Sequence, residues 1–380
     1  MAAPVLVVVF LRGGCDGLSL VSPTGDANYV AARPGGIRVE RDGDSPGLVL
    51  DGAAADADFR FHPQAKAFSE LYNAGDLAVI HAAGLTDATR SHFDAEDRME
   101  RAAQGGNTGG WLGRWLAAEQ PEGVLPALAV GASAPESLRG ADAVAVAQEL
   151  AGLRLAAGHG FSNPIRRMLA AKLGGDPLLG APIKRLLTLS DVIETRVALD
   201  ADGNLRPYAP EYDYPENNSL APSLKTVAQS IKLDLGLRVA TVDYGGWDTH
   251  VDQGGQFGRL VNELSTALMA FWRDLGKQQE RVSVVVMSEF GRRLKANESG
   301  GTDHGHGNVM LALGAPIKGG AMYGRWPGLD NDSLDSGADL AITTDYRHVL
   351  AELMAGHMKF GDTATLFPSF ASERVGFLRA

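Results

Sequence analysis

The chain is short of cysteine, of basic residues and of long apolar runs, and each shortage excludes a class of protein. Cys15 is the only cysteine among 380 residues, so no disulfide can form within the chain. The 35 basic and 46 acidic residues give a formal net charge of −11. Such a charge argues against nucleic acid or an anionic membrane as the main partner, because both attract a basic face. No apolar run approaches the roughly 20 residues of a transmembrane segment, and no signal peptide is visible.

The remaining composition is that of an ordinary globular protein in which strands and helices alternate. Hydrophobic residues make up 45% of the chain, enough for a large core. The valine-rich run 5–11 is typical of a strand buried on both faces of a parallel sheet. Further strands are expected at 77–82, 127–130, 238–244, 281–287, 308–313 and 339–343, and helices at 63–74, 91–103, 221–235, 256–277 and 345–354. Helices between strands imply crossovers, so the sequence predicts an α/β fold with a mainly parallel sheet flanked by helices.

Nothing in the sequence divides the chain into separate domains. It contains no internal repeat and no long linker, so residues 1–380 are predicted to form a single domain. Residues 130–235 are expected to be a helix-rich insertion or cap, with a loop at 206–219. Its helical part, 161–200, is expected to break at Gly174, Gly175 and Pro182.

Polar side chains follow the predicted strands at the edge where open α/β sheets bind ligands. Asp16 lies on a tight glycine turn after the first strand, either as a metal ligand or as an acceptor for the amides of its own turn. Asp248 and His250 follow the strand 238–244, two residues apart, so both can face one ion. Glu289 ends the strand 281–287 as a ligand or as the ion-pair partner of a following arginine.

The segment after the strand 77–82 offers a nucleophile. Ser91 precedes a predicted helix, where it is either a helix cap or a nucleophile at a helix N-terminus, which stabilises anions. Arg90 beside it can bind a phosphate or sulfate oxygen. His92, or a histidine further along the chain, His306, is the candidate general acid.

The strongest single pattern is the glycine-rich stretch 300–308, which contains Asp303, His304 and His306. Carboxylates and imidazoles concentrated on one loop are suitable ligands for a divalent metal ion. Four of the nine histidines fall within these polar clusters, which a random distribution would not favour. The sequence therefore predicts one metal site assembled from distant parts of the chain.

Five short runs, taken in order, are specific enough to indicate a family. They are VVVFLRGGCDGL (7–18), RSHFDAED (90–97), GGWDTH (245–250), SEFGR (288–292) and GGTDHGHG (300–307). Together they resemble a bacterial family catalogued as domain of unknown function 1501, which is grouped with the alkaline phosphatase-like superfamily. The resemblance covers nearly the whole chain.

This resemblance implies an alkaline phosphatase-like fold with one or two divalent ions beyond the sheet, and zinc, manganese, iron and calcium are the candidate metals. By motif order, Asp16 matches the first ligand, Ser91 the nucleophile, Asp248 and His250 the next ligand pair, and His304 or His306 the last histidine. Superfamily enzymes commonly carry Asp-His where this chain has Glu289-Phe290, so one ligand is absent or replaced. Nothing resembling Cys-x-Pro-x-Arg surrounds Cys15, which is expected to be a packing residue.

The leading hypothesis is a metal-dependent hydrolase of phosphate or sulfate esters, with Ser91 or a metal-bound water as nucleophile. The expected substrate is an anionic ester, either a small molecule or a group on a polymer. Two alternatives stay open: a non-catalytic metal-containing binding or scaffold protein, and a metal-dependent phosphosugar isomerase or mutase. Members of the family often carry twin-arginine export signals, so the resemblance implies a periplasmic or secreted protein. The sequence leaves the oligomeric state open.

Overall fold

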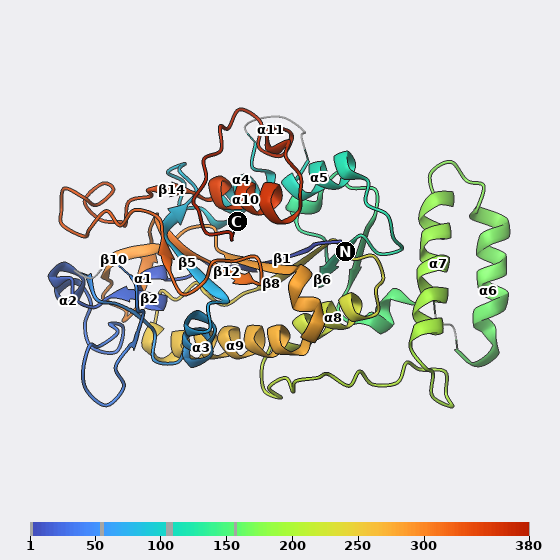
Figure 1. Cartoon of the computed structure of the whole chain (residues 1–380), viewed down its shortest axis with the longest axis horizontal. Helices are drawn as coiled ribbons and strands as arrows, with labels where there is room; N and C mark the ends of the chain where they lie inside the picture. Colours follow the sequence, from blue (N-terminus) through green and yellow to red (C-terminus); the bar gives the residue numbers. More distant parts are fainter. Residues whose placement is uncertain (1–2, 54–56, 104–108, 156–157, 380) are drawn as a thin grey trace.

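In the computed structural model, which describes residues 3–53, 57–103, 109–155 and 158–379, one large sheet forms the centre of the molecule (Figure 1). Its strand order is β13-β5-β12-β9-β1-β8-β6-β7, and β14 also pairs with β5. These strands are β1 (Val5–Leu11), β5 (Leu77–Gly84), β6 (Ala127–Val130), β7 (Val144–Ala147), β8 (Val239–Tyr244), β9 (Val282–Met287), β12 (Asn308–Gly314), β13 (Met322–Tyr323) and β14 (Thr344–Asp345). Two small sheets join β2 (Val21–Pro23), β3 (Leu48–Val49) and β4 (Phe59–Phe61), and β10 (Arg292–Ala296) with β11 (Thr302–His304).

Helices connect these strands, as predicted. The α-helices are α1 (Gly17–Leu20), α2 (Ala27–Ala32), α3 (Lys66–Asn73), α4 (His92–Arg101), α5 (Trp111–Glu119), α6 (Gly158–Leu173), α7 (Gly180–Arg196), α8 (Ala221–Lys232), α9 (Gln253–Asp274), α10 (Tyr346–Glu352) and α11 (Thr363–Leu366). Short turns of 3₁₀ or π helix are η2 (Glu136–Leu138), η3 (Leu150–Leu153), η4 (Gly276–Arg281) and η5 (Leu353–His357). No helix among the described residues is long and apolar enough to cross a membrane.

The direction of the strands brings several polar segments to one edge of the sheet. β12 runs antiparallel to both of its neighbours, β5 and β9, whereas every other pair in the large sheet is parallel. The predicted mainly parallel α/β fold is therefore confirmed. The carboxyl ends of β1, β5, β8 and β9 lie at the same edge as the beginning of β12. Loops that are far apart in the sequence can meet there.

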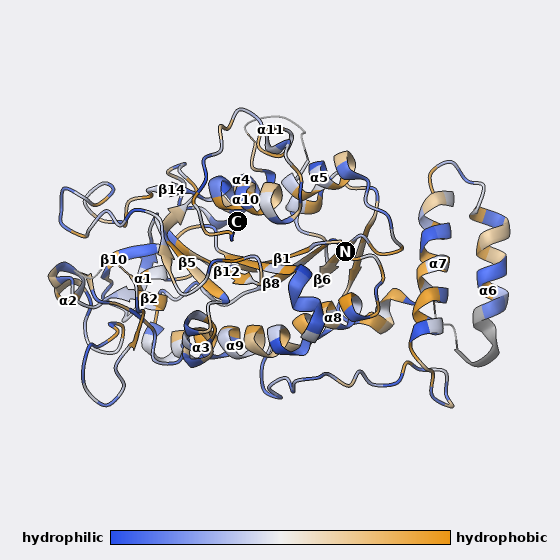
Figure 2. Ribbon diagram, viewed as in Figure 1, coloured by the Kyte–Doolittle hydropathy of each residue, from blue (hydrophilic) through white to orange (hydrophobic). Residues whose placement is uncertain are grey.

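The two faces of the sheet are covered by different helices, because alternate residues of a strand point to opposite sides. Val5, Val7 and Val9 of β1 join one core cluster with the buried sides of α3, α8 and α9. Leu6, Val8 and Phe10 join another with α4, α5 and α10. Figure 1 shows the sheet between these two layers, and in Figure 2 its central strands are coloured as hydrophobic.

Two local predictions are wrong. The expected strand at 339–343 is absent, since strand pairing begins at Thr344, and Asp339 makes isolated bridges only. The backbone there is drawn toward the loops at the sheet edge, where Asp339 accepts hydrogen bonds from Arg90. Pro182 does not break a helix but lies in the first turn of α7, where its missing N–H leaves no hydrogen bond unmade.

Residues 130–235, expected to be an insertion or cap, divide into two kinds of structure. β7 belongs to the large sheet, and α8 packs into its core. The helical hairpin of α6 and α7 projects at one end of the molecule (Figure 1), where α7 contacts the body through the buried Leu189 and Ile193. It lies at the opposite end of the molecule from α1 and β10, which border the polar edge of the sheet. The hairpin therefore does not cover that edge.

Candidate metal centre

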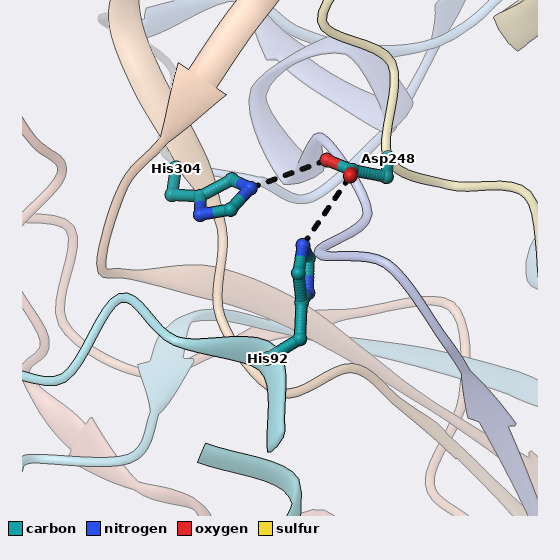
Figure 3. Close-up of side chains that lie close together, drawn as sticks. All are labelled: His92, Asp248 and His304. Atoms are coloured by element: carbon teal, nitrogen blue, oxygen red, sulfur yellow. Dashed lines mark hydrogen bonds and ion pairs between the residues drawn. The ribbon is translucent and has the colours of Figure 1, made fainter. Parts of the chain in front are cut away.

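Four side chains, from His92, Asp248, His250 and His304, meet beyond the strand ends and form what we call the four-residue cluster. His92 is the first residue of α4, Asp248 and His250 follow β8, and His304 ends β11. The potential ligand atoms of His92, Asp248 and His304 all lie within 4.8 Å of one another (Figure 3). The Nε2 of His250 lies 3.0 Å from Asp248 Oδ1 and 2.8 Å from His304 Nε2. The structure thus brings together three of the predicted metal ligands and the predicted catalytic histidine.

Each imidazole of the cluster is oriented by a hydrogen bond at its Nδ1. The Nδ1 atoms of His92, His250 and His304 lie 2.6 Å from Glu289 Oε1, 3.1 Å from Asp303 Oδ1 and 2.8 Å from the carbonyl oxygen of Arg90. All three partners are acceptors, so each Nδ1 carries a proton that it donates. In the neutral ring the lone pair then belongs to Nε2, and every Nε2 faces the cluster.

The atoms that converge in the cluster are electron-pair donors, and a positive charge between them would offset their mutual repulsion. The Nε2 atoms of His250 and His304 are 2.8 Å apart. The Nε2 of His92 is buried, has no hydrogen-bond partner among the described residues, and lies 3.5 Å from Asp248 Oδ2. A cation would satisfy all of these atoms at once. Three imidazoles and one carboxylate are a donor set for a borderline divalent ion, zinc above all, and the residues present therefore fit a metal.

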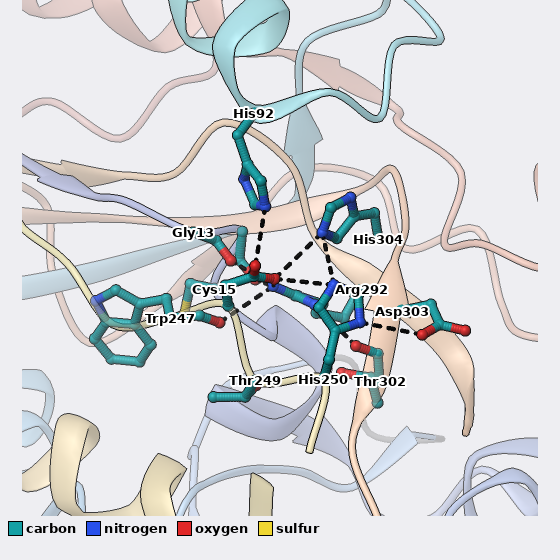
Figure 4. Close-up of polar contacts among 12 residues, drawn as sticks. Gly13, Cys15, His92, Trp247, Thr249, His250, Arg292, Thr302, Asp303 and His304 are labelled. Atoms are coloured by element: carbon teal, nitrogen blue, oxygen red, sulfur yellow. Dashed lines mark hydrogen bonds and ion pairs between the residues drawn. The ribbon is translucent and has the colours of Figure 1, made fainter. Parts of the chain in front are cut away.

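Arg292 ties the loops of the site together from beneath. Its guanidinium, which is fully buried, donates to Asp248 Oδ1 at 2.5 Å and to the carbonyl oxygens of Gly13, Gly14, Thr302 and Trp247 at 2.5, 2.6, 2.8 and 3.3 Å (Figure 4). Burial alone would raise the pKa of Asp248, but the hydrogen bond and charge of Arg292 lower it below its ordinary value. Arg292 thus occupies one oxygen of Asp248 and leaves Oδ2 facing His92.

Glu289 and Asp303 were predicted as direct ligands, but the structure places each carboxylate behind a histidine of the cluster. Glu289 is fully buried and accepts a hydrogen bond from the Gly13 amide at 2.8 Å besides the one from His92. Burial would raise its pKa, but these hydrogen bonds lower it, so the carboxylate stays charged. Asp303 also accepts from Asn297 Nδ2 at 3.0 Å. In this arrangement both carboxylates orient ligands rather than reach an ion.

Asp16 was predicted as a ligand too, and the structure does not bring it to the cluster. It caps α1, and Arg33 holds its two oxygens with a bidentate pair of hydrogen bonds at 2.5 and 3.0 Å. Ser19 and Gln253 donate to the same carboxylate at 2.8 and 2.6 Å. All of these groups are buried. Both oxygens of the Asp16 carboxylate therefore already accept hydrogen bonds within the protein. The sequence pattern gave no reason to pair Asp16 with Arg33.

His306 lies on the far side of its loop from His304. Its Nδ1 is hydrogen-bonded to Asp335 Oδ2, and its Nε2 lies 3.0 Å from the carbonyl oxygen of Leu85. The chain turns between the two histidines, and the amide of Gly305 donates a hydrogen bond to the carbonyl oxygen of Gly291. The backbone of Arg292 is so near that a Cβ on Gly305 would lie 2.4 Å from it. The expectation that Asp303, His304 and His306 act together from one flexible loop does not match this geometry.

The predicted nucleophile and anion-binding residue lie beside the cluster. Ser91 caps α4 by position, but its side chain makes no capping hydrogen bond and is exposed. Arg90 Nε donates to the buried Asp339 at 3.1 Å, as does its Nη2, while its Nη1 makes no hydrogen bond within the described residues. Cys15 is buried, and burial raises the pKa of its thiol, as expected of a packing residue rather than a nucleophile.

Sequence reasoning missed two features of the site. Arg292 was considered only as a partner of Glu289, whereas it pairs with Asp248. Glu96 lies one turn of α4 beyond His92, and burial raises its pKa to about 7. The pKa is raised despite the nearby Arg12, whose Nη1 lies 3.3 Å from Glu96 Oε2. A carboxyl group with such a pKa can give or take a proton near neutral pH. The spacing of four residues between His92 and Glu96 was the available signal, since it puts both on one helix face.

The fold and the cluster define an α/β protein with a histidine–carboxylate cluster, a candidate metal site, beyond the strand ends of its sheet. The chain belongs to the family described as "Protein of unknown function (DUF1501)", which matches residues 84–366 and so includes all four residues of the cluster. No curated protein matches the sequence.

Several solved structures resemble the chain at low identity. Alkaline phosphatase from the Antarctic bacterium TAB5 is 9% identical, with 83% of this chain and 93% of that chain covered and a TM-score of 0.32. A phosphonate monoester hydrolase from Silicibacter pomeroyi is 12% identical, with coverages of 98% and 78% and a TM-score of 0.41. The C-terminal periplasmic domain of EcEptC from Escherichia coli, in complex with zinc, is 7% identical, with coverages of 83% and 74% and a TM-score of 0.36.

The affinity of the cluster for zinc is expected to fall as the pH is lowered. The hydrogen bond that His92 donates to Glu289 raises the pKa of His92 above its ordinary value, and a proton competes with the metal for Nε2. Below the raised pKa the protonated form dominates, so proton competition begins at a higher pH than an ordinary histidine would give. Competition titrations from about pH 5 to 9 measure this onset. In Glu289→Gln the onset should move to lower pH, and an affinity independent of pH in the wild type would contradict the assignment of His92.

Proposed function

We propose that the protein is a hydrolase of phosphate or sulfate esters that depends on one divalent metal ion, held by His92, Asp248, His304 and His250. The observation that carries the proposal is the convergence of three imidazole Nε2 atoms on Asp248, each with its Nδ1 bound to an acceptor. An imidazole-rich donor set favours zinc, and iron or manganese over calcium, among the metals expected from the sequence. When bound, the ion would act as a Lewis acid and lower the pKa of the nucleophile.

The surrounding residues supply the other requirements of ester hydrolysis. Ser91 is next to His92 in the chain and exposed, with no capping hydrogen bond to hold its hydroxyl, so it is available as the nucleophile. The buried Asp339 holds the guanidinium of Arg90 by its Nε and Nη2 and leaves Nη1 for an ester oxygen. We propose that the substrate is an anionic ester for these reasons. We also propose that the protein belongs to the alkaline phosphatase-like superfamily and that it is periplasmic.

The test is turnover of a generic aryl phosphate and aryl sulfate by protein loaded with zinc, manganese or iron, alongside measurement of bound metal. Near-stoichiometric metal with metal-dependent release of phosphate or sulfate is the expected result. Ser91→Ala should retain the metal and lose at least about 100-fold in turnover if the hydroxyl is the nucleophile. Ser299→Ala, an exposed serine on the turn between β10 and β11, is the matched control. Unchanged turnover in Ser91→Ala would assign a water instead.

Three other results would overturn the proposal. A protein that binds no ion under any loading condition has no metal-dependent mechanism. A protein that binds metal stoichiometrically but hydrolyses none of a panel of phosphate and sulfate esters is a binding protein. Interconversion of a sugar phosphate without release of phosphate would identify an isomerase or mutase.

A further inference from the structure

Few side chains of the α6–α7 hairpin are buried, so packing against the rest of the protein accounts for only a small part of its surface. None of the described side chains from Asn163 to Leu173 on α6 is fully buried. On α7 only Gly180, Leu189, Ser190 and Ile193 are buried, and the last three lie toward its end. Figures 1 and 2 show the two helices projecting side by side from the body of the molecule. The half that includes the turn, which we call the outer half, contacts the body through Arg185, whose Nη1 donates to the carbonyl oxygen of Asp142 at 2.6 Å.

The charge of the hairpin is opposite to that of the protein. Residues 158–196 contain six basic and three acidic residues, a formal charge of +3, in a chain that carries −11. Arg166 is neutralised by Asp191 and Glu194. Arg167, Lys172 and Lys184 are exposed and form no ion pair within the described part of the chain. These unpaired cations lie on the outer half of the hairpin and can attract an anionic partner.

Exposed apolar side chains gather on the same half. Leu178 and Leu179 form the turn, and 84% and 49% of their surfaces are exposed. Met168 and Leu186 are 52% and 37% exposed. These four are among eleven large hydrophobic side chains that are exposed in the described residues, although the hairpin is about a tenth of the chain. Exposed apolar groups concentrated in this way mark a site of interaction.

Two backbone amides of the turn already have a hydrogen-bond acceptor within the chain. The Oδ1 of Asp176 accepts hydrogen bonds from the amides of Leu178 and Leu179, both at 2.8 Å. These two N–H groups would otherwise lose their water partners if the turn were buried. Lys172 and Lys184 lie within two helical turns of the tip, which corresponds to roughly 10 Å at 1.5 Å per residue. The tip is thus apolar, with cations arranged around it a short distance behind.

We propose that this hairpin docks the protein on the surface of an anionic phospholipid bilayer. Leu178 and Leu179 would enter the boundary between headgroups and acyl chains, which peripheral apolar segments penetrate by roughly 5–10 Å. Arg167, Lys172 and Lys184 would then lie at the level of the lipid phosphates. A projecting apolar tip suits a deformable bilayer better than the preformed concave surface of a protein partner. The hairpin would hold the acidic body away from the bilayer, and at physiological salt charges more than about 8–10 Å apart are largely screened.

This inference does not rest on the proposed hydrolase activity and is tested without it. The full chain is sedimented with vesicles of phosphatidylcholine alone or with about 30% phosphatidylglycerol, at low and physiological salt. The wild type is expected to bind the mixed vesicles and not the neutral ones, more weakly at higher salt. Leu178→Asp/Leu179→Asp and Lys172→Glu/Lys184→Glu should each weaken binding at least about ten-fold.

Matched variants separate a specific hairpin site from a general change in charge or hydrophobicity. Lys277→Glu/Lys318→Glu makes the same charge change on exposed lysines elsewhere, and Val30→Asp/Val49→Asp removes exposed apolar groups elsewhere. Both should bind the mixed vesicles within about two-fold of the wild type. Circular dichroism and thermal unfolding confirm that every variant is folded. Equal binding to both vesicle types, no binding, or a dimer that is lost in Leu178→Asp/Leu179→Asp would overturn the proposal, the last by showing a contact between copies of the chain.

Discussion

Replacing His304 by alanine is expected to lower the affinity for zinc by more than about 100-fold, whereas His306→Ala should leave it within about three-fold. His304 presents its Nε2 lone pair to the cluster because its Nδ1 donates to the Arg90 carbonyl oxygen. His306 is bound on both nitrogens, to Asp335 and to Leu85, and lies outside the cluster. Even a residue that only orients a ligand costs 10–100-fold when it is changed, so the loss of a ligand should cost at least as much.

The two variants are matched, because the same substitution is made two residues apart in one segment. Metal content after dialysis and competition titration with a chromophoric chelator measure the difference. Thermal unfolding of both proteins shows whether either change simply unfolds the loop. An equal loss of zinc in the two variants would show that His306 turns toward the ion, and would return the site to the arrangement expected from the sequence.

Arg292→Met is expected to lower the free energy of unfolding by roughly 3–5 kcal/mol and to abolish metal binding, because it removes a buried guanidinium that donates hydrogen bonds to several carbonyl oxygens. The guanidinium is fully buried and donates to four carbonyl oxygens as well as to Asp248. The carbonyl oxygens of Gly14 and Thr302 would lose this donor in a buried region, whereas the half-exposed Asp248 can turn to water. Arg292→Lys retains the charge but not the planar fork, so an intermediate loss is expected.

The neighbouring residue provides the control. Arg293 is 46% exposed and lies 3.8 Å from Asp339, so Arg293→Met should change the free energy of unfolding by no more than about 0.5 kcal/mol. Denaturant unfolding of the metal-free proteins measures these differences without a contribution from metal binding. A loss below about 1 kcal/mol in Arg292→Met would show that the loops are held by other contacts.

The sequence was sufficient to predict the edge of the sheet at which the site forms. Val5–Leu11 and Val282–Met287 read as buried parallel strands, and the ends of such strands lie together. Asp248, His250 and His304 were found by this logic. What the sequence could not supply is the direction of each side chain. Asp16 follows a strand just as Asp248 does, but Arg33 occupies it, and no local pattern connects those two residues.

The loop between β9 and β12 shows the same limit. A run of Asp303, His304, Gly305 and His306 reads as one flexible metal-binding loop. Asp303 and His304 instead lie on β11, whose alternation sends their side chains to different partners. The antiparallel pairing of Arg292 with His304 fixes that alternation, and it depends on residues on both sides of the turn. Spacing alone therefore identified the right segment but not which of its carboxylates and imidazoles face the four-residue cluster.

The reversed direction of β12 has a consequence for how the site can change over evolutionary time. Because β12 starts at the edge where β9 ends, the chain passes from one to the other without a crossover helix, through a segment that contains the small hairpin of β10 and β11. Residues 288–307 therefore contribute Glu289, Arg292, Asp303 and His304 as one contiguous segment between two anchored strands. Insertions or substitutions in that segment can alter the metal environment while the register of the sheet is kept. Apart from Arg292, whose loss is expected to destabilise the protein, this segment can therefore vary without disturbing the central strands.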